Sequence, residues 1–283
     1  MSEIKIFMCC HKQYETVPPT CKPIQCGSDL NSAIEGALRD NDGENISAKN
    51  REYCELTAHY YVWKNILADY YGFCHYRRFF CADNSIKKPY LALKAPREKL
   101  FPDEEQWRAL TAGYDVIVPR SEDMGISAKE HYCTAKYHYP EDMELFTRIL
   151  KEISPKFAAA GEKYLSQNRQ YFCNMFVMSR EYFFEYCENL FAILEEFDKR
   201  KTLHGDFQSD RTDGYLGEIF TGIYITCLKD KGVKILELPR ADVGCTLKKR
   251  ILYALLPPES KRRFFAKKII KAIGKRKIKC MIT

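Results

Sequence analysis

Two adjacent arginines follow an apolar run in the segment Tyr70–Phe80, which reads YYGFCHYRRFF. The first half of this segment favours a buried strand, and His75-Tyr76-Arg77-Arg78 stands at or just beyond the end of that strand. Guanidinium groups bind phosphate oxygens in a bidentate geometry, so Arg77 and Arg78, with His75, are candidates for binding a diphosphate. The alternative is structural: an arginine pairs with an acid at the sheet edge while the aromatic rings join the core.

Other phosphate and metal patterns are weak or missing. Neither GxxxxGK[ST] nor GxGxxG occurs, which disfavours P-loop and dinucleotide-binding proteins. Asp40 and Asp42 form a literal D-x-D, but the Asp-Gly step at 42 and 43 is also a turn signal. Glu55 and His59 lie one helical turn apart without a third ligand in view, so a polar pair on a helix is the preferred interpretation.

Two acids in the segment TDGYLGEIF, Asp213 and Glu218, stand near the start of a predicted helix over 214–229. A carboxylate beside a reacting hydroxyl can accept its proton, so either acid is a candidate general base. For Asp213 the alternative is a favourable interaction with the positive end of the helix dipole.

The thirteen cysteines predict buried, reduced thiols rather than a disulfide framework, because their number is odd and many lie inside apolar runs. No C-x-x-C pair occurs, so we expect no structural zinc site. The N-terminus is interrupted by charge too early for a signal peptide, and no window approaches eighteen continuous apolar residues. We therefore expect a cytoplasmic protein.

Strand and helix patterns alternate along the chain. Predicted strands cover 4–10, 23–27, 71–75, 115–119, 171–179 and 233–238, and predicted helices lie within 43–68 and 103–112, begin at 127 and 140, and cover 154–167, 180–200 and 214–229. This alternation favours an α/β fold with a mostly parallel central sheet flanked by helices. Such sheets bind ligands at the carboxyl ends of their strands, which is where His75 and the two arginines stand.

Basic residues are concentrated at the C-terminal end. The chain has a net charge of +7, and residues 247–283 alone carry +12, which leaves −5 for residues 1–246. Apolar residues recur among these lysines at helical spacing, namely Phe264, Phe265, Ile269, Ile270 and Ile273. We expect a main domain at 1–245 and, at 246–283, a basic amphipathic helical tail that binds an anionic membrane surface. Nucleic acid is the rival partner of the tail, which we do not favour, and a solvated tail without a partner is the third interpretation.

Several separated motifs resemble one known family. They are HKQYE (11–15), PIQCG (23–27), RDNDGENISAKNREYCELTAHYYVWKN (39–65), YYGFCHYRRFF (70–80), YDVIVP (114–119), EHY (130–132), NMFVMSREYFFEYC (174–187) and GYLGEIF (214–220). In this order they are similar to the family catalogued as domain of unknown function 4422, whose members are bacterial glycosyltransferases of capsule, exopolysaccharide and O-antigen gene clusters. The resemblance extends from about residue 4 to about residue 239 and leaves the basic tail outside.

The resemblance implies a single GT-A-like (Rossmann-like) domain that transfers a hexose from a UDP-sugar, with galactopyranose or galactofuranose favoured. The implied acceptor is an undecaprenyl-linked oligosaccharide, which places the enzyme peripherally on the inner face of the cell membrane. GT-A enzymes usually hold Mn²⁺ or Mg²⁺ with a D-x-D motif at the place where this sequence has HYRR. We therefore expect His75, Arg77 and Arg78 to stabilise the departing diphosphate without a required metal, and a Mg²⁺ or Mn²⁺ ion at Asp40 and Asp42 is the alternative.

The resemblance also suggests roles for single residues. Glu218 matches the glutamate of the family's Gly-Tyr/Phe-Leu-x-Glu motif and is the favoured catalytic carboxylate, with Asp213 as the runner-up. The expected nucleotide-binding residues are His11, Lys12, Asp40, Asp42 and Asn45, and the expected sugar and acceptor pocket contains Tyr76, Asn174, Met175 and Gly214. The alternative function is a non-catalytic carbohydrate-binding or scaffold protein of a polysaccharide assembly complex, which would need neither Glu218 nor the arginines.

Overall fold

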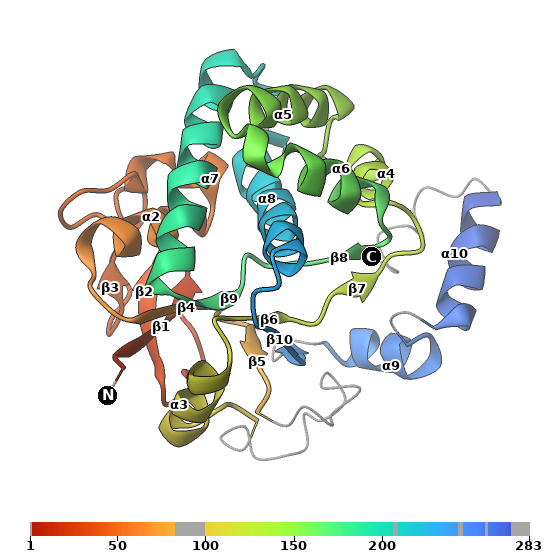
Figure 1. Ribbon diagram of the computed structural model, residues 1–283. Helices are drawn as coiled ribbons and strands as arrows, with labels where there is room; N and C mark the ends of the chain where they lie inside the picture. The colour runs from red at the N-terminus through yellow and green to blue at the C-terminus, as the bar shows by residue number, and fades with distance from the viewer. Residues whose placement is uncertain (1, 83–99, 206–208, 243–245, 258–259, 273–283) are drawn as a thin grey trace.

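The computed structural model describes residues 2–82, 100–205, 209–242, 246–257 and 260–272 (Figure 1). In that part of the chain the central sheet follows the order β10-β6-β9-β4-β1-β2-β3. These strands are β1 (Ile4–Cys10), β2 (Cys21–Gln25), β3 (Leu38–Arg39), β4 (Tyr70–His75), β6 (Val116–Pro119), β9 (Phe176–Ser179) and β10 (Ile235–Leu238). β9 runs antiparallel to both of its neighbours, and the other neighbours on this path run parallel. The prediction of a mostly parallel sheet is therefore confirmed.

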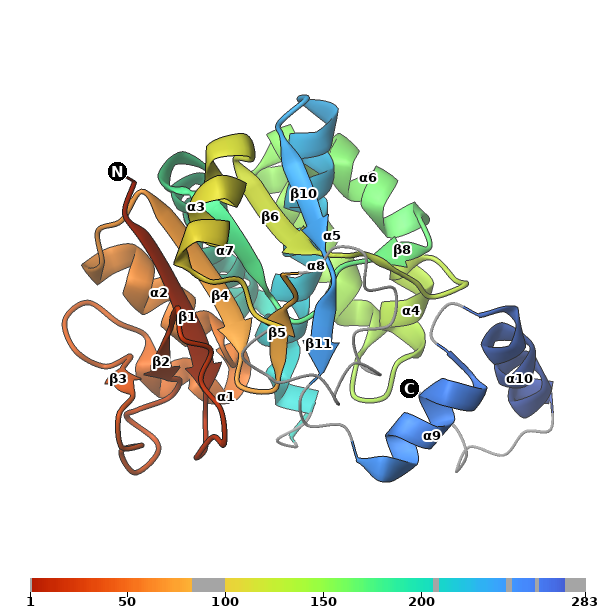
Figure 2. The same ribbon diagram turned by 90° about the horizontal axis from the view of Figure 1, so that it is seen from below.

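A short antiparallel ribbon, which the sequence did not predict, extends the sheet beside the end of β4 (Figure 2). It consists of β5 (Arg78–Phe80) and β11 (Arg240–Asp242), and β5 joins β4 where His75 pairs with Arg78. In its register Asp242 lies opposite Arg78. The ribbon therefore brings Arg240 of β11 close to the HYRR segment.

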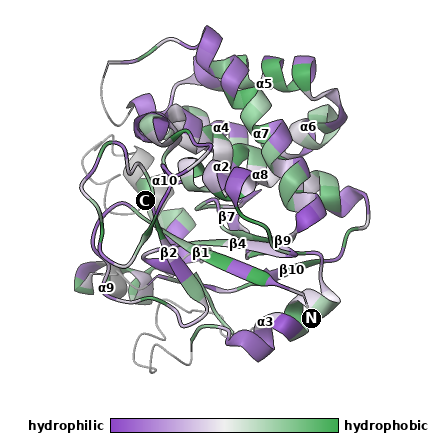
Figure 3. Cartoon of the chain, turned by 90° about the vertical axis from the view of Figure 1, so that its left-hand side faces the viewer, coloured by the Kyte–Doolittle hydropathy of each residue, from purple (hydrophilic) through white to green (hydrophobic). Residues whose placement is uncertain are grey.

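Helices cover the two faces of the sheet unequally (Figure 3). One face carries α2 (Leu56–Asn65), α4 (Ala128–Thr134), α5 (Pro140–Ile153), α6 (Ala158–Ser166), α7 (Arg180–Arg200) and α8 (Thr212–Asp230), and the other carries α3 (Glu104–Gly113). Because side chains alternate along a strand, Phe7 and Cys9 of β1 join the larger core beneath the helices, and Ile6 and Met8 join the smaller core on the α3 side. The sheet therefore lies between two apolar cores.

The remaining elements are a short helix, several short turns and strands, and two helices of the tail. They are α1 (Asn50–Tyr53), β7 (Glu122–Asp123), β8 (Arg169–Gln170), the 3₁₀ turns Ser47–Lys49, Pro155–Phe157 and Ser209–Arg211, and the tail helices α9 (Leu247–Leu255) and α10 (Lys261–Ala272). The expected tail is thus helical as far as residue 272, and the rest of it, 273–283, lies outside the described residues. Among the helices of the described residues, none is both long and apolar enough to cross a membrane.

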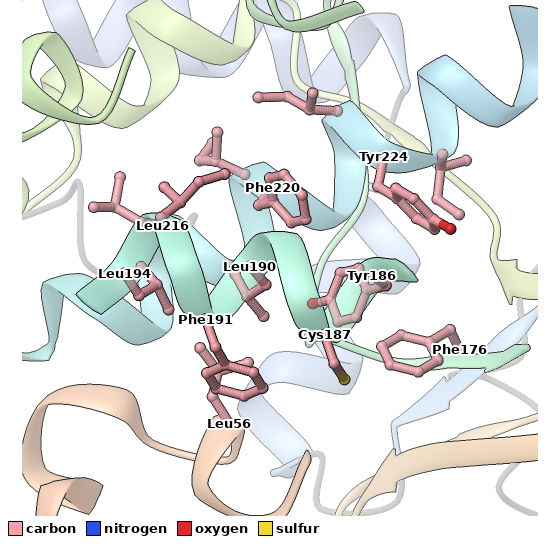
Figure 4. Close-up of a cluster of buried hydrophobic side chains, with 14 of the residues drawn as sticks. Leu56, Phe176, Tyr186, Cys187, Leu190, Phe191, Leu194, Leu216, Phe220 and Tyr224 are labelled. Atoms are coloured by element: carbon pink, nitrogen blue, oxygen red, sulfur yellow. The ribbon is translucent and has the colours of Figure 1, made fainter. Parts of the chain in front are cut away.

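Helix α8 is the central helix of the larger core and carries Glu218. Phe220 and Tyr224 of α8 lie among side chains of α7, including Tyr186 and Leu190 (Figure 4). α8 has buried residues on almost every side, which is why its sequence shows little amphipathic pattern. A Cβ atom at Gly222 would lie 1.9 Å from the Tyr164 ring, so the glycine permits this close approach. The position of α8 is therefore fixed by packing along its length.

Two predicted elements are interrupted where the backbone turns left-handed. The single long helix predicted within 43–68 is divided into a 3₁₀ turn, α1 and α2, because Cys54 has φ 53° and its carbonyl oxygen accepts a hydrogen bond from Asn50 Nδ2 at 2.6 Å. The strand predicted at 171–179 begins only at Phe176, since Cys173 and Asn174 have φ values of 80° and 46°. Non-glycine residues in this conformation are strained and often accompany functional sites.

Candidate active site

The two left-handed turns, the ribbon and the first half of α8 meet around Glu218. The backbone N–H of Cys173 donates a hydrogen bond of 2.6 Å to Glu218 Oε1. The side-chain amide of the next residue, Asn174, donates to Glu55 Oε1 at 3.0 Å. The strained turn thus binds one carboxylate with its backbone and a second with its side chain. One acid, Glu55, directly precedes α2, and the other, Glu218, lies in α8.

Burial raises the pKa of Glu218 to about 7, and the negative charge of Glu55 acts in the same direction. The Cys173 hydrogen bond and the charges of Arg78 and Arg240 oppose this rise and keep the pKa of Glu218 from going higher. A carboxylate with a pKa near neutrality accepts a proton more readily than an ordinary one and is still about half ionised at neutral pH. Glu218 therefore has the properties of a general base.

Arg78 and Arg240 supply positive charge next to Glu218. Arg240 donates hydrogen bonds to Cys173 Sγ at 2.9 Å and to the Glu122 carboxylate, so its position is fixed by protein partners. Arg78 is half-buried, and its guanidinium makes no hydrogen bond to any residue within the described ranges. Since a guanidinium has five N–H donors, Arg78 retains donors for an anionic ligand. The structural alternative was an arginine paired with an acid at the sheet edge. Arg240, which pairs with Glu122, fits this alternative, and Arg78 does not.

Tyr76 gathers the other predicted donor-site residues around its ring. The guanidinium carbon of Arg77 lies 4.9 Å from the ring centroid, Lys12 Nζ lies 5.8 Å from it, and His11 contacts the ring edge-on at 5.2 Å. Arg77 is exposed, whereas Tyr76 is buried. The structure therefore brings the residues after β1 and those after β4 into one basic and aromatic surface, as two parallel neighbouring strands require.

His75 is a neutral donor in this surface. Burial lowers the pKa of His75 to about 3, and the charges of Arg78 and Arg77 lower it further. Its Nδ1 atom accepts a hydrogen bond from the backbone N–H of Arg77 at 3.3 Å, which puts the ring proton on Nε2. His75 can therefore donate one hydrogen bond to an oxygen ligand, but it adds no charge.

Asp40, Asp42 and Asn45 do not form a free carboxylate site. Asp40 is buried, and its carboxylate accepts hydrogen bonds from the backbone N–H groups of residues 27 and 28 and from Ser47 Oγ. The Asn45 amide donates to the backbone oxygens of residues 41 and 43. Asp42 is exposed. A divalent ion at the D-x-D sequence would have to displace three donors from Asp40, so these residues fit the turn interpretation and not a metal.

Asp213 lies outside the Glu218 cluster. Its Oδ2 atom accepts a hydrogen bond from Lys201 Nζ at 2.6 Å, and the same ammonium group contacts Glu52 and Asp198. Glu52, Asp198 and Asp213 are close enough to hold a cation, and Lys201 is that cation. Asp213, the alternative candidate for the catalytic acid, thus lies in a buried ion-pair network that anchors the start of α8 to the end of α7.

The predicted pocket residues divide into two groups. Asn174 and Gly214 lie in the Glu218 cluster, since Asn174 Nδ2 donates to the backbone oxygen of Gly214 at 3.3 Å. A Cβ atom at Gly214 would lie 2.8 Å from Cys54 Sγ, so the glycine lets α8 approach the Cys54 turn. Met175 is 1% exposed and belongs to the smaller core, so the structure places it in packing rather than on a pocket wall.

Three residues of the cluster were missed as site residues from the sequence, namely Glu55, Arg211 and Arg240. Arg211 donates to Cys54 Sγ at 3.1 Å, and its charge, with those of Lys12 and Arg77, adds to the effect of burial in lowering the pKa of His11. Glu55 was considered only with His59, whose ring is buried against Phe73 instead. The available signal for Arg240 was its place after the last predicted strand, where loops of an α/β sheet gather ligand-binding groups.

The mixed sheet, the basic segment at the tip of β4 and the acid on α8 together define a GT-A-like fold of the glycosyltransferase type. A family model described as domain of unknown function (DUF4422) matches residues 5–230, and the chain belongs to this family. Its structure is similar to the apo structure of WbbM, a bifunctional glycosyltransferase, with a TM-score of 0.80 and 30% sequence identity. The match covers 86% of this chain and 46% of that chain, so this chain spans less than half of WbbM's length. No curated protein matches the sequence significantly. The predicted family and fold are both confirmed.

Replacing Lys201 with Met should destabilise the protein by about 3–5 kcal/mol in urea unfolding, because the buried carboxylate of Asp213 would lose its cation. Lys199→Met is the matched control: Lys199 is exposed, and its loss should leave the free energy of unfolding nearly unchanged. At a temperature where Lys201→Met remains folded, it should keep the rate of wild type. A loss of turnover without a loss of stability would indicate that Asp213 acts in catalysis.

Proposed function

We propose that this chain is a glycosyltransferase that moves a hexose from a UDP-sugar to an undecaprenyl-linked glycan during bacterial surface polysaccharide synthesis. The observation that carries the proposal is a half-buried carboxylate, Glu218, with a pKa near 7, close to Arg78, whose guanidinium retains free N–H donors. Family membership and the similarity to a bifunctional glycosyltransferase support the reaction class. Galactopyranose and galactofuranose are the donor sugars that we favour, from the resemblance alone.

In the proposed reaction an acceptor hydroxyl attacks the anomeric carbon of the donor. Glu218 accepts the proton of that hydroxyl, a new glycosidic bond forms, and the bond between the sugar and the diphosphate breaks, so UDP leaves with the electron pair. Negative charge grows on the diphosphate as it leaves, and preformed donors stabilise such charge most effectively in a water-poor site. We assign this role to Arg78 and Arg77, with a neutral hydrogen bond from His75.

The residues around the proposed diphosphate site do not suit a divalent metal. Mg²⁺ and Mn²⁺ prefer oxygen ligands, whereas the HYRR segment supplies two guanidinium groups and one imidazole, and the neighbouring Asp242 lies opposite Arg78 in the ribbon. Asp40, the first acid of the D-x-D sequence, already accepts three hydrogen bonds inside its loop. The proposal therefore contains no step through a metal.

A panel of UDP-sugars, each assayed for sugar transfer and for UDP release with and without a chelator, tests the proposal directly. One donor should be turned over, and its rate should change less than about two-fold on adding the chelator, since the arginines replace the cation in function. Release of UDP from no donor, with tight glycan binding retained, would instead favour the carbohydrate-binding or scaffold alternative. A rate that the chelator abolishes and Mn²⁺ restores would refute the arginine mechanism.

Arg78→Gln should lower kcat by about 100- to 1000-fold, because it removes charge that stabilises the leaving diphosphate. Arg78→Lys should recover part of this loss, since lysine keeps the charge without the bidentate geometry. Arg108→Gln is the matched control, because Arg108 is exposed on α3 and pairs with the exposed Glu104. Circular dichroism and thermal unfolding establish that each variant is folded. An Arg78→Gln enzyme with wild-type turnover would contradict the proposed role.

The rate constant kcat/KM should rise with pH and level off above about pH 7, because Glu218 must be ionised to accept a proton and its pKa is raised to about 7. Glu55→Gln should move this inflection to lower pH, since the negative charge of Glu55 raises the pKa of Glu218. Glu218→Gln should lower kcat by about 1000-fold above about pH 8, where Glu218 is ionised, and should remove the pH dependence near pH 7. An unshifted profile in Glu55→Gln would mean that Glu218 is not the titrating group.

A further inference from the structure

Five exposed apolar side chains form stripes on the two tail helices, and we call them the tail stripes. They are Leu247, Ile251 and Leu255 on α9, and Phe265 and Ile269 on α10, with exposed fractions between 42% and 71%. The spacing of four residues puts the members on one face of each helix. Exposed apolar residues are common singly, but a row along a helix face indicates an interaction surface.

The tail helices are packed in place rather than attached only by the chain. Phe264 of α10 lies against Gly125 in the loop before α4, where a glycine Cβ would come within 2.9 Å of the ring. Arg263 is buried, donates to the backbone oxygen of Leu256 at 3.3 Å and stacks over the Tyr253 ring at 5.3 Å. α10 therefore contacts α9 on one side and the main domain on the other. The tail stripes remain exposed on the other faces of the two helices.

Charge identifies the chemistry that would cover the tail stripes. Lys248, Lys261 and Arg262 are exposed on the same two helices, within a region 247–283 of net charge +12. A second copy of this surface would bring like charges together. A nucleic acid would match the charge but would leave five apolar side chains in water. An anionic lipid leaflet accepts both, because lysines contact the headgroups while leucine, isoleucine and phenylalanine enter the acyl boundary.

We propose that α9 and α10 dock the protein on an anionic bilayer through the tail stripes and the basic residues around them. The docked helices lie at the active-site side of the molecule: β11 contributes Arg240 to the Glu218 cluster, and only four residues separate the end of β11 from the start of α9 (Figure 2). Resting on the proposed function, this placement would hold the arginine cluster near lipid-linked acceptors. The docking itself depends only on the tail.

Sedimentation with vesicles tests the docking. The full chain should bind vesicles of phosphatidylcholine with phosphatidylglycerol and should bind pure phosphatidylcholine at least about ten-fold more weakly. The double variant Ile251→Glu/Leu255→Glu should bind the anionic vesicles at least about ten-fold more weakly than wild type. Lys261→Gln/Arg262→Gln should lose roughly five-fold per charge, with a larger loss at low salt. Leu67→Glu is the control, because Leu67 is 70% exposed on the main domain and away from the tail.

Several outcomes would overturn the docking proposal. They are equal binding to both kinds of vesicle, undiminished binding of Ile251→Glu/Leu255→Glu, and a wild-type dimer that this double variant converts to a monomer, which would make the tail stripes an interface between copies. Tighter binding to duplex DNA than to vesicles, surviving the double variant, would overturn it in favour of nucleic acid. Sugar transfer to a soluble acceptor should be equal in all these variants, so a failure of docking is distinguishable from a failure of the proposed reaction.

Discussion

The protonation of Glu218 depends on the balance between burial and the cations around it. Burial and Glu55 favour the neutral acid, whereas Arg78, Arg240 and the Cys173 N–H favour the carboxylate, and the opposing effects leave the pKa near 7. A unit charge about 5 Å away is worth about 3 kcal/mol at an effective dielectric constant of 20. In the proposed reaction a diphosphate bound to Arg78 would therefore raise the affinity of Glu218 for a proton at the moment when the acceptor must lose one.

This balance requires groups from four distant parts of the chain to be held close together. The antiparallel strand β9 begins immediately after the left-handed residues Cys173 and Asn174, so the turn can point a backbone N–H at α8. The ribbon of β5 and β11 pairs Arg240 with Phe80, two residues along the strand from Arg78, and brings the two arginines close enough for their charges to interact. Helix α8 cannot shift to relieve the strain, because Gly222 is packed against Tyr164 and Asp213 is paired with Lys201. The strained turn is thus maintained by the core around it.

The molecule separates its charges along the sequence. The main region 1–246 has a net charge of −5, and the tail region has +12. In the main domain, positive charge gathers where β1 and β4 end, at Lys12, Arg77 and Arg78. A negatively charged body with a basic tail would orient itself on an anionic surface before any specific contact forms, because the field of the whole molecule acts at longer range than the apolar contacts do.

The sequence alone determined the class of fold, the family and the HYRR segment at a strand tip, because strand and helix periodicity, and a string of specific motifs, are local properties. It also predicted Glu218, whose place in a motif could be read without knowing its neighbours. The tertiary structure decided which acid lies beside the arginines: Asp213 is only five residues from Glu218, yet it faces Lys201. It also supplied Glu55, Arg211 and Arg240, since pairing across a sheet, left-handed turns at Cys54 and Cys173, and the pKa of a buried group depend on residues that are close in space and far apart in the chain.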